Sequence, residues 1–477
     1  MQLVKLHLYD TRSRQKQAFV PLEEGKVGMY HCGPTVYQRP HIGNYRAFLF
    51  ADLLRRVFEV LGYEVKQIMN LTDVGHLLAD AEEGEDKLEA QARKDNLDPW
   101  QIVDSVSKQF FADLNELGVQ PAHAYPRATE YIDEMVEMIE VLIDKGHAYK
   151  VGSNVYFDVH SFAKYGDLSG NNIADLEAGA RLEINVEKRH PADFALWKTD
   201  EKHLMKWDTV FGEHGFPGWH IECSAMSRKF LGDHFDIHTG GEDNVFPHHE
   251  CEIAQSECAH NGNFVNHWMH TKFLQVDGGK MSKSLGNVYS LDDLCARGFC
   301  ALDFRFLMMR GHYRSSLNFT FEALQGAAEG RKNLCGFINR LQSAAGEATA
   351  DNTPCAALQA AKQDFIAALC DDLNTSSAIA AVFTLRSEFM KGEFSPAQSA
   401  AALEFMRNTV QQVFGDFTDE QCADDSISDA DVDDLIEQRT QARADKDWSK
   451  ADEVRDQLSA AGIVVEDTAD GIKWHRA

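Results

Sequence analysis

Residues 40–44, PHIGN, and residues 278–284, GGKMSKS, have residue types that suit the binding of a triphosphate. Gly43 has no Cβ to keep a nucleotide from the backbone, and a helix that begins here would point free N–H groups at a phosphate. Lys280 and Lys283 follow a glycine pair, and two mobile ammonium groups can neutralise charge that develops at an attacked α-phosphate. Alone, the first segment is more often a turn and the second is often an exposed polar loop.

A second candidate set contains two cysteines, a histidine and a glutamate: Cys32, Cys223, His248 and Glu252. His248 and Glu252 are four positions apart, so on a helix they share one face and can bind the same ion. Two thiolates, an imidazole and a carboxylate suit Zn²⁺ in donor type and number. Each residue alone is ordinary, because a single buried cysteine is usually part of the core. Cys251 is a third thiol beside Glu252, and whether it competes for the ion is open at this stage.

A strand, a helix and a second strand are expected to position these residues. Apolar runs at 27–32 and 65–69 predict strands, and residues 43–61 have apolar side chains at helical spacing. Such a βαβ unit crosses over right-handed into a parallel sheet, and ligands bind at the carboxyl ends of its strands. Cys32 and His41 follow the same strand, so we expect the metal set and the phosphate loop to meet there.

Length, composition and charge set the broad class. The 477 residues are 44% hydrophobic and 26% charged, which is typical of a soluble globular protein with several domains. We expect a cytoplasmic protein with no membrane partner, because the sequence shows no signal peptide pattern, no long apolar run and no regular disulfide spacing. The net charge of −28 opposes RNA binding, but a local basic surface can bind RNA on an acidic body.

The two loops in this order, with a βαβ unit under the first, resemble the signature sequences of class I aminoacyl-tRNA synthetases. CGPTVY at 32–37, GWHIECSAM at 218–226 and GGEDNVFPHHE at 240–250 resemble segments of the cysteinyl-tRNA synthetases. The resemblance implies an enzyme that uses ATP with Mg²⁺ to convert L-cysteine to cysteinyl-adenylate, and that transfers the cysteine to the 3′ end of cysteine tRNA. It also implies that the cysteine, histidine and glutamate set binds one Zn²⁺ per chain, which binds the substrate thiolate directly.

The resemblance further assigns roles to single residues. The expected catalytic residues, which stabilise charge without a covalent intermediate, are His41, Asn44, Lys280 and Lys283. The residues expected to bind the nucleotide are Gly43, Gly240, Gly241, Asp243 and Lys283. The residues expected to bind cysteine are Gly33, Thr35, Thr72, Trp219 and His220. Asn44 departs from the family pattern, which has a second histidine there, and asparagine can donate a hydrogen bond but carries no charge.

The expected fold class is α/β, with a split Rossmann-like parallel sheet, an inserted domain, a following helical domain and a small C-terminal unit. The expected parts are 1–117 and 206–290 for the two halves of the catalytic domain, 118–205 for the inserted connective domain, 291–335 for a stem-contact region, 336–423 for a helical tRNA-binding domain, and 424–477 for a linker and an anticodon-reading unit. The charge-rich residues 79–94 are interpreted as a solvated helix or loop.

Basic residues gather in two places where tRNA is expected to bind. One group interleaves basic and aromatic side chains, which suits phosphate contact and base stacking, although a helix end with ordinary core aromatics would look the same. Its members are Arg305, Arg310, His312, Tyr313 and Arg314. The other, at 434–476, is enriched in arginine and lysine and resembles the anticodon-reading end of the family. We expect the enzyme to be a monomer.

Two other functions are compatible with parts of the sequence. A ligase that joins activated cysteine to an amino sugar would share the zinc site and the adenylate chemistry, but it should lack a C-terminal RNA-reading unit such as 434–476. A zinc protein that binds RNA without catalysis would show no cysteine-dependent exchange between ATP and pyrophosphate. The synthetase interpretation accounts for nearly the whole chain.

Overall fold

The structure of the protein is a computed structural model. It describes residues 5–74, 86–171, 187–282, 285–350, 354–417 and, with short gaps, 429–476. Lys283, residues 79–85 of the charge-rich segment and most of the expected linker lie outside the described residues. The chain divides into two compact units, one of residues 1–331 with 337–415 and one of residues 332–336 with 416–477.

A parallel sheet forms the centre of the first unit, with the strand order β11-β10-β3-β4. Its strands are β3 (Lys26–His31), β4 (Glu64–Met69), β10 (Phe235–Gly241) and β11 (Val265–Thr271). The helices beside them are α1 (Ile42–Val60), α6 (Ile221–Leu231) and α7 (His248–His260). An antiparallel pair, β1 (His7–Asp10) and β2 (Gln15–Ala18), precedes them. The predicted strand, helix and strand around 27–69 are confirmed.

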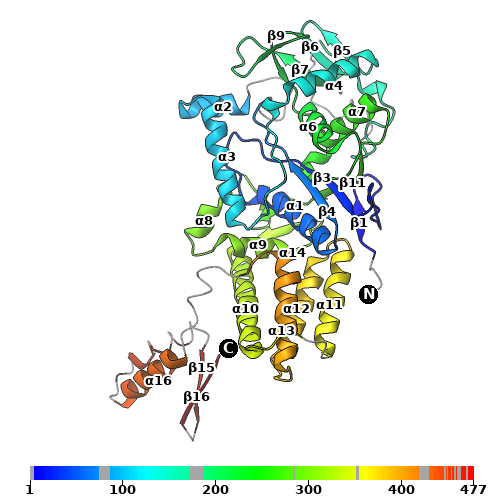
Figure 1. The fold of residues 1–477 in the computed structure, drawn as a ribbon. Coiled ribbons are helices and arrows are strands. Elements are labelled where there is room, and N and C mark those ends of the chain that lie inside the picture. Colours follow the sequence, from blue (N-terminus) through cyan, green and yellow to red (C-terminus); the bar gives the residue numbers. More distant parts are fainter. Residues whose placement is uncertain are drawn as a thin grey trace. The chain divides into compact units, whose positions relative to one another are not determined.

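An insertion separates β4 from β10 in the sequence, and it lies at the top of Figure 1. Its antiparallel sheet has the order β5-β6-β7-β9-β8. The strands are β5 (Ala148–Val151), β6 (Asn154–Phe157), β7 (Phe194–Thr199), β8 (Trp207–Thr209) and β9 (Gly212–Pro217). The helices before the sheet are α2 (Lys87–Asp95), α3 (Pro99–Glu116) and α4 (Ile132–Asp144). The sheet continues to Pro217, and the domain boundaries given above stay predictions.

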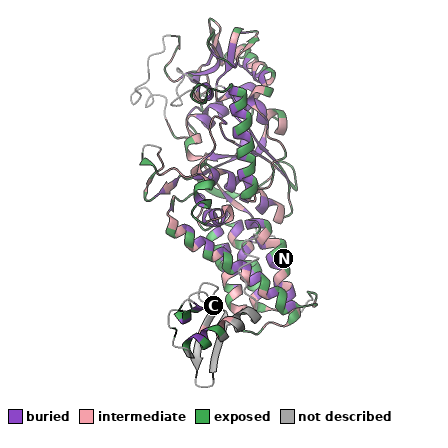
Figure 2. Ribbon diagram, turned by 90° about the vertical axis from the view of Figure 1, so that its left-hand side faces the viewer, coloured by how far each residue is buried: buried purple, intermediate pink, exposed green. Residues whose placement is uncertain are grey.

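A small sheet and a set of helices complete the first unit. The sheet contains β12 (Leu274–Val276), β13 (Gly279–Lys280) and β14 (Leu317–Phe319). The helices are α8 (Leu291–Cys295), α9 (Ala301–Met309), α10 (Phe321–Ala345), α11 (Ala356–Cys370), α12 (Thr375–Phe389), α13 (Pro396–Phe405) and, after a π-helical turn at 406–410, α14 (Gln411–Phe414). Buried and exposed residues alternate around these helices, as amphipathic packing requires (Figure 2).

The second unit contains a helix and a hairpin. These are α16 (Asp429–Ala444), β15 (Ile463–Thr468) and β16 (Gly471–Arg476), with β15 and β16 antiparallel. Val454 and Leu458 form a small core against which Leu435, Ile436 and Val465 pack. Among the described residues of the whole chain, no helix combines the length and apolar character needed to cross a membrane.

Candidate active site and metal centre

Four donor side chains converge at the carboxyl end of β3. Cys32 follows β3, Cys223 lies in the first turn of α6, and His248 and Glu252 share one face of α7. We call these four residues the donor cluster; their ligand atoms lie within 4.8 Å of one another, and all but Cys32 are buried. Ligands at about 2.0–2.3 Å from a tetrahedral Zn²⁺ stand about 3.3–3.8 Å apart, so one ion fits after small side-chain adjustments.

The donor cluster holds more negative than positive charge when its thiols ionise. Burial raises the pKa of Glu252, but His238, with Nε2 2.8 Å from Oε2, and His248, with Nε2 3.1 Å from Oε1, outweigh it and lower that pKa to about 2. Burial lowers the pKa of His248, but hydrogen bonds to Cys223 and Glu252 outweigh it and raise that pKa to about 10. A hydrogen bond to Cys32, followed by burial, raises the pKa of Cys223 well above its ordinary value. The site therefore favours a cation that stabilises the thiolates.

Buried histidines behind the donor cluster were missed in the sequence analysis. His249 Nε2 lies 3.1 Å from Cys32 Sγ, and its Nδ1 lies 2.8 Å from His270 Nε2. His238 and His249 form a second group of possible metal donors with Cys32 and Glu252. Burial and neighbouring histidines lower the pKa of His249 well below its ordinary value. The available indication was the presence of histidines at 238 and 270 within apolar strands.

Cys251 faces away from these donors. Its Sγ lies 3.5 Å from the hydroxyl of Tyr165 in the insertion, and the residue is 1% exposed. It belongs to neither group of possible metal donors among the described residues. Burial raises the pKa of the Cys251 thiol, so this sulfur stays protonated near neutral pH. The geometry answers the question left open by the sequence: Glu252, and not Cys251, faces the other donors.

His41 and Asn44 begin helix α1 together. His41 is the N-cap residue, and its Nδ1 accepts a hydrogen bond of 3.2 Å from the N–H of Gly43. Asn44 Oδ1 accepts a hydrogen bond of 3.0 Å from the N–H of His41, which completes a capping box. The amide oxygen of Asn44 is thus used by the backbone, and its amide N–H₂ group is the part that can donate to a ligand. This gives a structural reason for an asparagine at the position where the family pattern has a histidine.

The lysine loop packs against the start of α1. A Cβ on Gly43 would lie 2.8 Å from Met281 Cε, so the Met281 side chain reaches the space that the glycine leaves open. The N–H of Ile42 also donates to the carbonyl of Tyr289 over 2.9 Å. Lys280 is exposed at the end of β13. The two signature segments therefore lie side by side, although Lys283 is not among the described residues.

The expected cysteine-binding residues lie on both sides of the donor cluster. Gly33 is in close contact with the next strand, because a Cβ there would lie 1.7 Å from the carbonyl oxygen of Asn70. Thr35 and Thr72 pair through their backbones, and Thr72 Oγ1 donates to Glu222 Oε2 over 2.9 Å. Glu222 is buried, and burial raises its pKa well above the ordinary value. This network joins β4 to α6 beside Cys223.

Trp219 and His220 form the side of the site next to His248. The ring centroids of Trp219 and His248 are 4.5 Å apart, and His220 Nδ1 lies 2.9 Å from His248 Nδ1. The structure therefore places the two residues beside a donor, where the sequence analysis expected the wall of an amino-acid pocket.

The expected nucleotide-binding glycines end strand β10. A Cβ on Gly240 would lie 2.9 Å from the His249 ring, and one on Gly241 would lie 2.3 Å from Asp243 Oδ1. Asp243 lies in the 3₁₀ turn Glu242–Val245, which leads to α7. These backbones are open to a close neighbour only because both residues are glycine.

The interpretation of residues 305–314 as an RNA-contact surface is wrong for Arg305 and Tyr313, which are buried, and it stays a prediction for the other members. Arg305 is 2% exposed, and its guanidinium donates to Asp52 and to main-chain carbonyls. Tyr313 is 6% exposed, and Arg314 forms an ion pair with Asp372. His312 donates through Nε2 to the Asp372 carbonyl over 2.9 Å. Only Arg310 of this group stays exposed without such a partner among the described residues.

Comparison with known proteins covers nearly the whole chain. Residues 18–329 match the family described as tRNA synthetases class I (C) catalytic domain, residues 364–418 match the DALR domain, and residues 428–474 match the Cysteinyl-tRNA ligase anticodon binding domain. The cysteine–tRNA ligase of Deinococcus radiodurans is 43% identical over 98% of this chain and 96% of its own length. Those of Treponema denticola and Thermus thermophilus are 40% and 42% identical over 99% and 98% of this chain, and over 100% and 99% of their own lengths.

Solved structures with low sequence identity share the fold. The methionyl-tRNA synthetase of Mycobacterium tuberculosis in complex with methionyl-adenylate is 14% identical, with a TM-score of 0.58 over 81% of this chain and 89% of its own. The agnB2 LeuRS of Agrobacterium radiobacter K84, in a ternary complex with tRNA and LeuAMS, is 12% identical, with a TM-score of 0.64 over 85% of this chain and 86% of its own. With the split sheet, the paired signature loops and the full-length relatives taken together, the chain belongs to the cysteine–tRNA ligases, a family of class I aminoacyl-tRNA synthetases.

Proposed function

We propose that the donor cluster binds one Zn²⁺ and that this site selects cysteine. The observation that carries the proposal is the convergence of two thiols, an imidazole and a carboxylate within 4.8 Å, next to Trp219 and His220. When bound, zinc supplies a soft Lewis acid that prefers a thiolate to a hydroxyl group. His238 holds the second oxygen of Glu252, and His220 holds the second nitrogen of His248, so the donors are oriented by their neighbours.

Selection by sulfur solves a problem that shape alone leaves open. Cysteine and serine differ in one atom, and a small group in an apolar pocket changes binding by only about 1–3 kcal/mol. We therefore assign discrimination to the donor cluster, with Gly33, Thr35 and Thr72 on the side of β3 and β4 placing the amino-acid backbone. Trp219 and His220 close the opposite side.

We also propose that the signature loops stabilise the phosphates while the cysteine carboxylate attacks the α-phosphate of ATP bound with Mg²⁺. His41, the amide group of Asn44, Lys280 and Lys283 stabilise the charge that moves onto pyrophosphate. Gly43, Gly240 and Gly241 let the nucleotide approach the backbone, with Asp243 beside the adenosine. A terminal ribose hydroxyl of cysteine tRNA then attacks the carbonyl of the adenylate, the bond from that carbonyl carbon to the phosphate oxygen breaks, and AMP leaves. No covalent enzyme intermediate is required.

We propose that the tRNA acceptor stem binds the region 291–335, as the sequence predicts, but through residues other than the buried members of the expected group. Arg297 is exposed, and its guanidinium lies 4.2 Å from the Phe321 ring centroid and 4.9 Å from that of Tyr289. Stacking fixes the plane of a guanidinium whose edge can still donate to a phosphate. Arg297 and the exposed Arg310 therefore replace the buried residues as candidates. Replacing either by glutamine should raise the KM for tRNA and leave cysteine-dependent ATP–pyrophosphate exchange unchanged.

The decisive experiment measures ATP–pyrophosphate exchange with cysteine and with serine, together with the zinc content of the protein. We expect about one zinc per chain, a preference for cysteine that exceeds about 200-fold, and loss of both in Cys223→Ser. Cys258→Ser is the matched control, because Cys258 is also buried but lies outside the donor groups, and it should retain metal and activity. Active protein without zinc, or equal use of serine, would refute the proposal.

A further inference from the structure

The turn between α11 and α12 has an unusual backbone. Asp372 and Leu373 have φ angles of 59° and 56°, in the left-handed region that residues other than glycine rarely adopt. Both residues are 1% exposed, so the turn is enclosed by other parts of the molecule. The N–H of Asp372 donates to the carbonyl of His7, at the start of β1, over 2.9 Å. A strained turn of the helical bundle is thus inserted into the part of the unit that carries the parallel sheet.

The Asp372 carboxylate gathers donors from two other segments. Oδ1 accepts from the N–H of Tyr9 over 2.9 Å and from the hydroxyl of Tyr313 over 2.6 Å. Oδ2 accepts from Nε and a second guanidinium nitrogen of Arg314, the first over 2.7 Å. The Arg314 guanidinium also lies 4.3 Å from the ring centroid of Tyr9. Two guanidinium nitrogens on one oxygen of a buried carboxylate form charge-assisted hydrogen bonds, which fix geometry more tightly than a neutral hydrogen bond.

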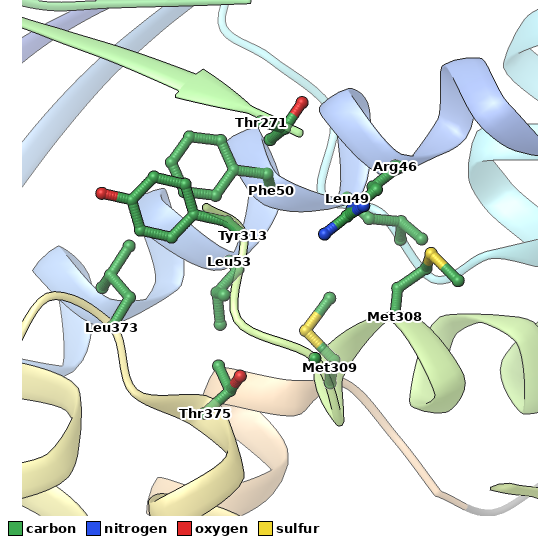
Figure 3. A pocket seen from close by; sticks show the side chains of 11 residues that line it. Arg46, Leu49, Phe50, Leu53, Thr271, Met308, Met309, Tyr313, Leu373 and Thr375 are labelled. Atoms are coloured by element: carbon green, nitrogen blue, oxygen red, sulfur yellow. The ribbon is translucent and has the colours of Figure 1, made fainter. Parts of the chain in front are cut away.

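The segment 312–315 continues this network to both signature loops. On α1, Arg46 donates through Nη2 to the carbonyls of His312 and Ser315, and through Nη1 to that of Phe273 over 2.7 Å. The N–H of Lys272 donates to the carbonyl of Tyr313 over 2.9 Å. Figure 3 shows Arg46 and Tyr313 lining one pocket between α1 and the turn after α11.

These contacts end close to the residues assigned to phosphate binding. Arg46 is two positions after Asn44 on α1, and residues 272–273 lead directly into β12, which pairs with β13 and Lys280. The ring of Tyr313 also stacks on Phe50, one turn further along α1, with centroids 4.4 Å apart. The Asp372 carboxylate therefore fixes the segment 312–315. That segment in turn contacts α1, which follows the first signature loop, and residues 272–273, which precede the second.

We propose that Asp372 is a positioning residue for cysteine activation, which sets the relative placement of the two signature loops through Arg314, Tyr313 and Arg46. The inference rests on the proposed roles of His41 and Lys280, because these are the groups that would be misplaced. A displacement of about 1 Å at a reacting group can lower the rate about 100-fold, so partial loosening of the network should lower kcat measurably. Binding of cysteine at the donor cluster should be little affected, because the network contacts none of its residues.

The test is Asp372→Asn, which keeps the size and one acceptor oxygen but removes the charge that pairs with Arg314. We expect kcat of cysteine-dependent exchange, per active site counted by adenylate formation, to fall about tenfold. The KM for cysteine and the zinc content should stay within about twofold of the parent protein. Asp371→Asn is the matched control, because Asp371 is the adjacent acid but is exposed and pairs with Lys16, and it should leave kcat unchanged.

A second variant keeps the test informative if Asp372→Asn does not fold. Arg314→Gln acts on the same ion pair from its partly exposed partner, and it should lower kcat to a similar extent, whereas Arg314→Lys should restore part of the rate. Where both folded variants are available, the double variant should be no slower than either single one. Variants with a lower melting temperature but unchanged kcat per active site would show that Asp372 is only a structural anchor. Absence of cysteine-dependent exchange in the parent protein would instead contradict the proposed function itself.

Discussion

The first unit contains two buried clusters of polar side chains, and they differ in whether other groups of the chain balance their charge. One is the donor cluster at the end of β3. The other, here called the arginine cluster, consists of Asp52, Arg56 and Arg305, between α1, α9 and α14. Arg305 donates to Asp52 Oδ2 over 2.6 Å, and Arg56 donates to the same oxygen over 2.7 Å. Two guanidinium groups therefore share one carboxylate inside the protein.

The excess positive charge of the arginine cluster is met by main-chain carbonyls. Arg305 donates to the carbonyls of Phe414 and Leu117 over 2.6 and 3.0 Å, and Arg56 donates to that of Gly118 over 2.8 Å. These carbonyls end helices α14 and α3, where the helix dipole is negative. The arginine cluster thus has all its partners within the chain, and it joins helices.

The donor cluster lacks such internal compensation. The carboxylate of Glu252 already contacts His238 and His248. Ionisation of the two thiols of the cluster would therefore add negative charge that has no positive partner among the described residues. Burial makes such an imbalance costly, because a charge without a partner is poorly solvated inside a protein. The comparison separates two uses of buried polarity: a group satisfied within the chain stabilises the fold, and a group left short of positive charge is suited to an external cation.

The largest expected effect is on the stability of the protein, and it comes from a substitution in the arginine cluster. Arg305→Met removes one of the two guanidinium groups that share Asp52, and it leaves the Phe414 and Leu117 carbonyls without their donor. Asp52 keeps Arg56 as its partner, but each buried carbonyl left without a donor costs about 1–3 kcal/mol, so the free energy of unfolding should fall by about 2–6 kcal/mol. Denaturant unfolding monitored by circular dichroism measures this difference.

Arg297→Met is the control for that variant, because the Arg297 guanidinium is exposed and stacked on aromatic rings. Its loss should cost less than about 1 kcal/mol, as for exposed cation–π contacts. Equal effects of the two substitutions would show that the arginine cluster has no special role in stability.

A smaller effect is expected from His238→Gln, which acts on the donor cluster through Glu252. The substitution removes the 2.8 Å contact between His238 Nε2 and Glu252 Oε2 while all four donors stay in place. Loss of an orienting partner lowers metal affinity about 10- to 100-fold. Competition with a coloured zinc chelator measures this change. His267→Gln is the control, because His267 is also a buried histidine but its ring makes no hydrogen bond to any described residue. The zinc affinity of this variant should match that of the parent.

The elements around the site could be predicted because their determinants are local. The apolar spacing at 43–61 and the runs at 27–32 and 65–69 fix the βαβ unit, and the observed bounds differ from them by at most one residue. In the insertion, β5 and β6 are neighbours in the sequence and form a hairpin, but the pairing of β7, β8 and β9 with it depends on contacts that no local pattern contains.

The partners of buried charges could not be predicted for the same reason. Arg305 and Asp52 are 253 positions apart, and nothing near Arg305 indicates that an aspartate on α1 takes its charge. Without that partner, an arginine among aromatic residues has the appearance of an RNA contact. The donor residues could be proposed from their residue types, from the spacing of His248 and Glu252 and from the resemblance to a family. His249, whose neighbours come from β10 and β11, needed the fold to be known.

A still smaller effect is expected from Cys251→Ala, which tests whether the third thiol belongs to the donor cluster. Its Sγ lies 3.5 Å from the Tyr165 hydroxyl, and the residue belongs to neither group of possible metal donors among the described residues. Zinc content and the cysteine preference should be unchanged, and the small cavity should lower the free energy of unfolding by about 1 kcal/mol. A reduced zinc content in the folded variant would show that Cys251 takes part in metal binding.

The smallest effect is expected at His203, a buried residue that gains favourable interactions with neighbouring carboxylates only while it is protonated. Its Nδ1 lies 2.8 Å from the Met205 carbonyl and 3.2 Å from Glu89 Oε1, and its Nε2 lies 3.7 Å from Asp86 Oδ2. Burial opposes the charge, but Asp86 and Glu89 outweigh it and raise the pKa of His203 above the ordinary value. The stabilisation is therefore complete below the unfolded-state pKa of about 6.5 and is lost as pH rises through the folded-state pKa.

His203→Gln should remove this dependence, so the stability difference between parent and variant should be largest at pH 6 and should shrink toward pH 9. Unfolding of both proteins across this range measures the difference, and shared contributions from other histidines cancel in the comparison. A difference that grows with pH would mean that His203 is buried as the neutral form. In that case its two carboxylate neighbours would be compensated elsewhere, and the contrast between satisfied and unsatisfied buried groups would not extend to the insertion.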